Sequence, residues 1–203
     1  KTLGGVDDEK GYKWSVTGTS YYAGEAFYPS IMSYQELGFL VPVIRNTSFW
    51  IRNTLGQSFG DRESAMSYFY LGGFRNNFVD WRAPRQYRTS LAFPGEDIDG
   101  IAAYNYIRTM GELNLKPIRT RNFGTTWLYP TFIYSSVFGT HLFTDPDRSE
   151  LSRHVFNLGF QTDIEVVMFS YLKTTWSAGY AWLFEQNQKM RGQWFLSLKL
   201  LGN

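Results

Sequence analysis

The residues most able to do chemistry in this sequence are two histidines and a short acidic segment, and their spacing points to no reaction centre. His141 and His154 flank the segment TDPDRSE, and no cysteine or paired carboxylate stands near either at metal-ligand spacing. Asp145 and Asp147 within it could bind calcium weakly, but they are also typical of an acidic turn. The chain has no glycine-rich phosphate loop and no nucleophile elbow. We therefore expect no enzymatic activity, no metal and no cofactor.

The overall composition excludes further classes of function. The 203 residues carry a formal net charge of +2 and no cysteine. So small a positive balance argues against nucleic-acid binding, which needs basic residues massed on one face. Aromatic residues make up 19% of the chain, while the mean hydropathy is only −0.31. No uninterrupted apolar run approaches the roughly 20 residues of a membrane-spanning helix, which excludes a helical membrane protein.

Alternation of apolar and polar residues predicts about eight strands and no helix of any length. The segment DIEVVMFSYL (163–172) also fits helical spacing, but its valines and aromatic residues favour a strand. A tight turn is predicted at Lys173 and Thr174. The predicted strands are Tyr12–Tyr22, Ser30–Pro42, Thr47–Phe59, Ile101–Leu115, Thr125–Phe143, Val155–Leu172, Thr175–Phe184 and Gln193–Leu201.

A segment of weak periodicity, rich in Gly, Pro, Asn and Arg, runs from about residue 60 to residue 100. It is much longer than ordinary connections between strands, so we expect it to be functional or packed into something.

The same alternation of apolar and polar residues is expected for two classes of β-protein. A soluble sandwich or lipocalin-like barrel buries its apolar face, whereas a membrane barrel turns that face to lipid. The predicted strands exceed the usual globular length, and short and long connections alternate along the chain. Aromatic residues gather near strand ends, where membrane barrels carry aromatic girdles: Tyr12, Trp14, Trp127, Tyr129, Trp176 and Trp182. We therefore predict an all-β fold, a transmembrane antiparallel β-barrel in contact with outer-membrane lipid and lipopolysaccharide.

The segment SAGYAWLF (177–184) illustrates the expected faces. Its three large aromatic residues, Tyr180, Trp182 and Phe184, would meet lipid. The small residues between them, such as Gly179 and Ala181, would line a lumen crowded by another part of the protein.

The segment SFWIRNTLGQSFG, followed by YFYLGGFRNNFVDW, resembles the barrel of the BamA-type outer-membrane assembly and translocation superfamily. In that family a strand ending in an aromatic residue and glycine precedes a long loop, which opens with an aromatic pair, Gly-Gly and an Arg-Gly-Phe element. Phe69, Tyr70, Gly72, Gly73 and Phe74 match the opening. Five predicted strands follow this loop, as in the family, so the resemblance implies the C-terminal half of a sixteen-stranded barrel. It covers residues 48–201.

A closer likeness is to barrels at the carboxyl end of proteins that begin with a TolB-like propeller. These are expected to show GGF-NN-VD, then YR, FPG, a Glu-Leu-Asn-Leu run and a final SLK. The matching residues here are Gly72, Gly73, Phe74, Asn76, Asn77, Val79, Asp80, Tyr87, Arg88, Phe93, Pro94, Gly95, Glu112–Leu115 and Ser197–Lys199.

One departure from the family concerns its loop arginine, because the Arg-Gly-Phe element is missing. The arginines that could replace it are Arg75, Arg82, Arg85 and Arg88, and the candidate lumen acids are Glu112, Asp163 and Glu165. A buried guanidinium–carboxylate pair would hold the loop in the lumen. Alternatively, the arginines are solvated, LGGF is a plain glycine turn, and Arg52, Arg108 and Glu112 merely hydrate the interior.

Half a barrel leaves two open edges, so we expect a partner, either the remaining half in the same polypeptide or a separate chain. The resemblance implies insertion or translocation of other proteins in the bacterial outer membrane, with periplasmic domains and accessory subunits as further partners. The terminal strand, with Trp194, Leu196, Leu198 and Leu200, would form the seam and pair with a client strand. The alternatives are a non-enzymatic anchor for a periplasmic propeller or binding module, and a passive pore.

Overall fold

The part of the chain that the structure describes is almost entirely β-structure. The computed structural model describes residues 8–75, 79–80, 83–120, 124–125, 127–169, 171–186 and 188–200, except for the side chain of Asp80. Asn76, Asn77 and Arg82, which the sequence singles out, lie outside the described residues.

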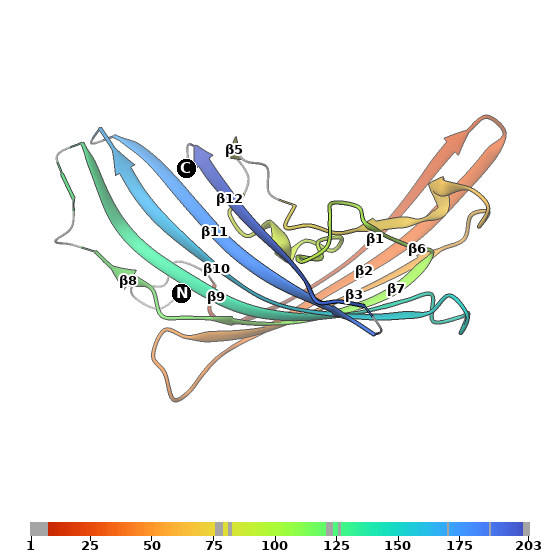
Figure 1. Cartoon of the computed structure of the whole chain (residues 1–203), viewed down its shortest axis with the longest axis horizontal. Coiled ribbons are helices and arrows are strands. Elements are labelled where there is room, and N and C mark those ends of the chain that lie inside the picture. Colours follow the sequence, from red (N-terminus) through yellow and green to blue (C-terminus); the bar gives the residue numbers. More distant parts are fainter. Residues whose placement is uncertain are drawn as a thin grey trace.

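Eight long strands lie where the alternation predicts them (Figure 1). They are β1 (Gly11–Ala23), β2 (Ala26–Leu40), β3 (Ser48–Ser58), β7 (Asn105–Asn114), β9 (Leu128–Thr144), β10 (Arg153–Met168), β11 (Leu172–Glu185) and β12 (Arg191–Leu200). The short elements are η1 (Ala65–Ser67), β4 (Phe69–Leu71), β5 (Val79–Asp80), η2 (Gln86–Arg88), β6 (Ile101–Ala103) and β8 (Ile118–Arg119). The all-β prediction is therefore confirmed, and the ambiguous segment that begins at Asp163 is strand as far as Met168. The turn predicted at Lys173 and Thr174 is wrong, because both residues belong to β11.

The long strands form one antiparallel sheet in the order β1-β2-β3-β7-β9-β10-β11-β12. β8 pairs with β9 beyond the end of β7, and β5 pairs with the outer edge of β12. Within the described residues β1 and β12 do not pair with each other, so the sheet is open and does not close into the predicted barrel. Figure 1 shows a strongly curved sheet, with the segment between β3 and β7 lying in its hollow.

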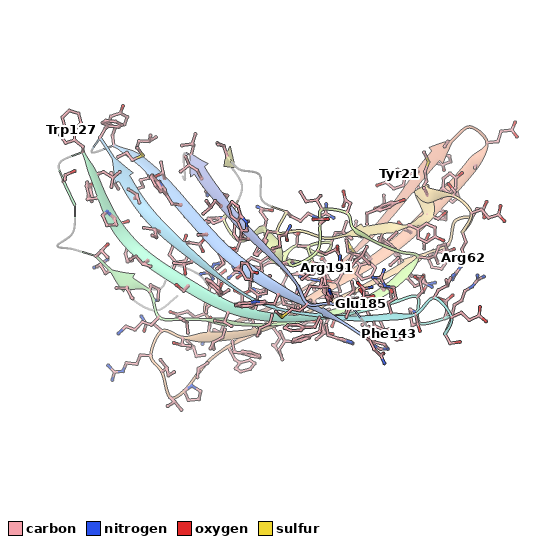
Figure 2. All side chains as sticks on the ribbon, viewed as in Figure 1. Tyr21, Arg62, Trp127, Phe143, Glu185 and Arg191 are labelled. Atoms are coloured by element: carbon pink, nitrogen blue, oxygen red, sulfur yellow. The ribbon has the colours of Figure 1, made fainter. Side chains whose placement is uncertain are left out.

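The curved sheet has an inner face, the concave side on which the described residues between β3 and β6 pack, and an outer face, the convex side. In β11, Gly179 and Ala181 are buried on the inner face, and Ala181 packs against Phe74 of the loop. Trp182 and Phe184 lie on the outer face, as the alternation predicts. Figure 2 shows side chains projecting from both faces along the whole sheet.

Glycines on the inner face make room for aromatic rings of the neighbouring strands. Gly38 lies opposite Trp50, and Gly56 lies opposite Tyr106. A Cβ atom at either glycine would overlap the facing ring. The same relation joins two further pairs on the inner face, Gly159 with Phe138 and Gly179 with Phe195. These large rings therefore lie close against the backbone of the neighbouring strand, which leaves room in the hollow for the loop.

Candidate functional site

The loop formed by residues 59–100 is folded onto the inner face and is not an extended connection. β4 pairs with β6, so the two ends of the loop are joined just before β7 begins. Leu71 and Phe93 of the loop are fully buried in one apolar cluster with Leu142 of β9 and Leu183 of β11. This part of the inner face is therefore a packed apolar core.

The two glycines of the LGGF motif allow two distant parts of the loop to come together. Gly73 has a φ of 66°, a conformation that favours glycine, and Phe93 donates a backbone hydrogen bond to its carbonyl oxygen at 3.1 Å. A Cβ atom on Gly72 would overlap the carbonyl oxygen of Asp97. The motif therefore does more than turn the chain, because it joins the LGGF and FPGE segments backbone to backbone.

Aromatic stacking fixes the middle of the loop on the sheet. The ring of Phe74 lies 4.0 Å, centroid to centroid, from that of Phe195 in β12. The ring of Tyr87 stacks on Phe138 of β9 at 4.3 Å, and its hydroxyl hydrogen-bonds Ser136 Oγ at 2.7 Å. Burial raises the pKa of the Tyr87 phenol well above its usual range, so this group remains a neutral hydrogen-bonding partner.

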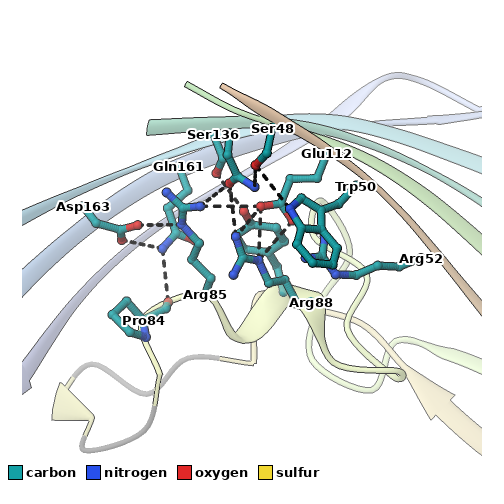
Figure 3. A network of polar contacts seen from close by, with 12 residues as sticks. Ser48, Trp50, Arg52, Pro84, Arg85, Arg88, Glu112, Ser136, Gln161 and Asp163 are labelled. Carbon is teal, nitrogen blue, oxygen red and sulfur yellow. Dashed lines mark hydrogen bonds and ion pairs between the residues drawn. The ribbon is translucent and has the colours of Figure 1, made fainter. Parts of the chain in front are cut away.

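Glu112 of β7 is the centre of a buried ion-pair network that we call the loop latch (Arg52, Arg85, Arg88, Glu112 and Asp163). The Glu112 side chain is fully buried and accepts hydrogen bonds from Arg88 Nε at 3.1 Å and from Arg52 Nη1 at 2.5 Å. Arg85 Nε donates to Asp163 Oδ2 of β10 at 2.9 Å. Because Arg85 and Arg88 belong to the loop and the other three residues to the sheet, the latch fastens one to the other (Figure 3).

Ion pairs and further hydrogen bonds make the burial of the latch charges tolerable. Arg52 Nε also donates to Glu36 Oε2 of β2 at 3.0 Å, so three guanidinium groups face three carboxylates. Asn114 Oδ1 accepts further hydrogen bonds from both loop arginines, and Gln161 Nε2 donates to Asp163 Oδ1 at 2.6 Å. Removing one partner from such a buried pair typically costs about 3–5 kcal/mol, because the other charge is left uncompensated.

The structure brings together some of the candidate residues and separates others. Arg85, Arg88, Glu112 and Asp163 meet in the loop latch. Arg75 lies elsewhere, 2.8 Å from Asp99 Oδ1, and donates to the carbonyl oxygen of Tyr70, so its ion pair stays within the loop. Glu165 also lies apart, and it accepts a hydrogen bond from Thr131 Oγ1 at 3.0 Å.

Two charged residues have an environment that the sequence did not predict. The alternative interpretation that Arg52, Arg108 and Glu112 merely hydrate the interior is wrong, because Glu112 is fully buried in the loop latch and the two arginines are only 3% and 0% exposed. Arg108 Nη2 donates to the carbonyl oxygen of Tyr87 at 2.9 Å. Arg52 lies diagonally across from Glu112 in the β3–β7 register, a relation that follows from strand pairing and not from sequence spacing.

A second set of contacts ties the FPGE segment to β10 and β12. Pro94 accepts a hydrogen bond on its carbonyl oxygen from Asn157 Nδ2 of β10 at 2.7 Å. The backbone N–H of Gly95 donates to Gln193 Oε1 of β12 at 3.1 Å. Glu96 accepts two hydrogen bonds from Arg191 of β12, at 2.9 and 2.8 Å. The FPGE segment is therefore anchored near the start of β12.

The acidic turn and the histidines serve local contacts. Asp145 Oδ1 accepts from the backbone N–H of Tyr104 at 3.1 Å, and Asp147 Oδ1 accepts from Asn105 Nδ2 at 3.1 Å. Partial desolvation raises the pKa of Asp147, but the hydrogen bond from Asn105 acts against it, and the pKa lies below its usual value. His141 Nε2 lies 3.2 Å from His154 Nδ1 on exposed surface. Within the described residues, no three His, Cys, Asp or Glu side chains are grouped as metal ligands.

Comparison with known proteins identifies no relative: no family model, curated protein or solved structure matches this chain. Among the described residues, no helix has the length and apolar character to cross a membrane.

Proposed function

We propose that this chain is part of an outer-membrane β-barrel of the BamA-type superfamily, with a role in the insertion or translocation of other proteins. The observation that carries the proposal is the distribution of polarity between the two faces. Large apolar side chains remain exposed along the outer face of the last four long strands: Val137, Phe156, Leu158, Phe160, Trp176, Phe184, Trp194 and Leu196. The inner face holds the buried ions of the loop latch. This arrangement suits lipid outside and a polar, loop-filled interior.

Aromatic contacts at the two ends of the sheet support a membrane setting. At one end, Trp127 meets Phe169 edge to face at 6.0 Å between ring centroids. Toward the opposite ends of β9 and β10, Phe143 stacks on His154 at 4.2 Å. Figure 2 labels Trp127 and Phe143 at these two separated positions. Membrane barrels carry aromatic girdles where each end meets the lipid headgroups.

The open edges of the sheet support a partner that completes the barrel. Unpaired backbone groups in lipid cost several kcal/mol each, so β1 and β12 need further strands within a membrane. Eight antiparallel strands place β1 and β12 in opposite directions. A second set with an even number of strands would therefore pair antiparallel at both junctions, whether it belongs to the same polypeptide or to another chain.

The experiment for the membrane setting compares the purified chain with and without detergent. We expect it to need detergent, and, once its open edges are paired with further strands, to enter phospholipid vesicles in a form that protects β9–β12 from added protease. A control variant with Glu150→Gln in an exposed turn should behave in the same way. A chain that stays monodisperse in plain buffer would reject a membrane barrel in favour of a soluble fold.

The second candidate function is an anchor for a periplasmic propeller or binding module. The loop latch favours it over a passive pore, because a loop held on the inner face by Arg85 and Arg88 obstructs the hollow of the sheet. Disulfides that lock β12 to its neighbour in the completed barrel distinguish the two roles. Loss of growth and of client assembly supports insertion, whereas unchanged growth and assembly support the anchor. Steady ion conductance in planar bilayers would instead support the pore.

A further inference from the structure

The terminal strand β12 contacts the loop through the inner face of its first half and through its edge near the C-terminal end. On its inner face, Arg191 contacts Glu96, Gln193 contacts Gly95, and Phe195 packs against the tilted ring of Phe74. These three residues alternate along the strand, as side chains on one face must. The inner side of β12 is therefore already occupied before any strand joins its edge.

The loop also reaches the outer edge of β12 through β5. Val79 pairs with Leu198, and Asp80 pairs with Lys199, in a parallel arrangement. Every other junction in this sheet is antiparallel. Within the described residues, no strand pairs with the edge of β12 between Arg191 and Leu196. β5 thus covers only the C-terminal part of an edge that is otherwise ready for pairing.

We infer that β5 is a placeholder on the docking edge of β12, displaced when the strand that closes the barrel arrives. The inference rests on the proposed function, because it assigns the edge to the completing half of the barrel. Parallel pairing is slightly less stable per residue than antiparallel pairing, and β5 contributes only two residues against the ten that β12 pairs with β11. A longer antiparallel strand is therefore favoured over β5 for the same backbone groups.

The contacts of β12 also define the chemistry of the incoming strand. On the outer face, Trp194 and Leu196 are 69% and 50% exposed, so apolar side chains opposite them would extend the outer surface. On the inner face, Gly95 and Phe74 already fill the space beside β12. The partner is therefore an extended strand with apolar residues outward, small residues inward, and a direction opposite to that of β12.

A cysteine pair tests the placeholder directly, because the chain has no native cysteine. In detergent-solubilised full chain, the double variant Val79→Cys/Leu198→Cys should form a disulfide readily. The control Val79→Cys/Leu196→Cys, two residues out of register, should form it several-fold more slowly. Equal rates for the two pairs would show that β5 does not pair with β12 at this register and would overturn the inference.

A peptide then tests competition for the edge. The probe is a labelled synthetic copy of β11, Leu172–Glu185, a strand that pairs antiparallel with both of its neighbours and has large residues on one face and small ones on the other. We expect it to bind the reduced Val79→Cys/Leu198→Cys variant at least tenfold more tightly than the oxidised one, with a scrambled peptide as control. Equal binding to both forms, or binding to neither, overturns the placeholder. Failure to enter vesicles, measured separately, would overturn the membrane function and not the competition.

Discussion

Glu112 offers the sharpest test of the loop latch, because its buried carboxylate contacts three arginines. The variant Glu112→Gln keeps the shape of the side chain and removes the charge. Arg85 would retain Asp163, and Arg52 would retain Glu36. Arg88 would lose the carboxylate that its Nη2 contacts at 2.5 Å. Removing one partner of a buried ion pair typically costs about 3–5 kcal/mol. Since two of the three arginines keep a partner, we expect the free energy of loop docking to become less favourable by about 3 kcal/mol, the lower end of that range.

Such a loss is measurable as exposure of the loop. A change of 1.4 kcal/mol alters an equilibrium tenfold, so 3 kcal/mol raises the undocked population roughly 100-fold. Trypsin cuts after arginine, and its rate at Arg85 and Arg88 follows that population when docking is fast relative to cleavage. Glu150→Gln, in an exposed turn, is the matched control. Cleavage of the Glu112→Gln loop within twofold of the unmodified protein would refute the latch.

A double-mutant cycle separates the ion pair from general disruption. If Arg88 acts through Glu112, the variant Arg88→Gln should add little to the effect of Glu112→Gln. Additive effects would mean that the two side chains hold the loop independently.

Three further predictions concern the faces and the turns of the sheet. Leu158→Lys on the outer face should cost about 2–4 kcal/mol in vesicles, whereas Leu151→Lys in an exposed turn should cost little, as measured by unfolding titrations. Gly38→Ala should lower stability by about 1–3 kcal/mol because its Cβ meets the facing indole, but Gly18→Ala, with open space around it, should not. The pKa of Asp147 lies below its ordinary value of 3.8. The ionised carboxylate therefore stabilises the folded turn above that pH, and this stabilisation is lost as the pH falls through the lowered pKa. The hydrogen-exchange protection factors in its turn, which correct for the intrinsic pH dependence of exchange, should therefore fall on acidification, and Asp147→Asn should remove this change.

The strands could be predicted from the sequence because their alternation is a local signal. Both faces of β11 follow from residues 177–184 alone, and β-branched residues decided the ambiguous segment that begins at Asp163. The turn after β10 was misplaced because alternation continues across it without a Gly, Pro or Asn to mark it. Boundaries of this kind depend on pairing with neighbouring strands, which no local pattern records.

The interior of the loop could be predicted only as a set of candidates. Four arginines stand within 14 residues of one another, and nothing in their spacing distinguishes Arg85, which reaches Asp163, from Arg75, which stays within the loop. The choice depends on the fold of the loop, which rests on the pairing of β4 with β6 and on two glycines. The rings over glycines were missed for a similar reason, since Gly38 and Trp50 become neighbours only through strand register.

The anchors of the loop on later strands also order the events of folding. Arg85 pairs with Asp163, which lies 78 residues later in the chain. Glu96 pairs with Arg191, which lies 95 residues later. The hairpins between consecutive long strands need no such distant partner and can form as each strand emerges. We therefore expect the loop to dock last, once β10 and β12 are in place. Its docking acts as a check on assembly, because a sheet that lacks its final strands leaves Glu96 without Arg191 and Phe74 without Phe195.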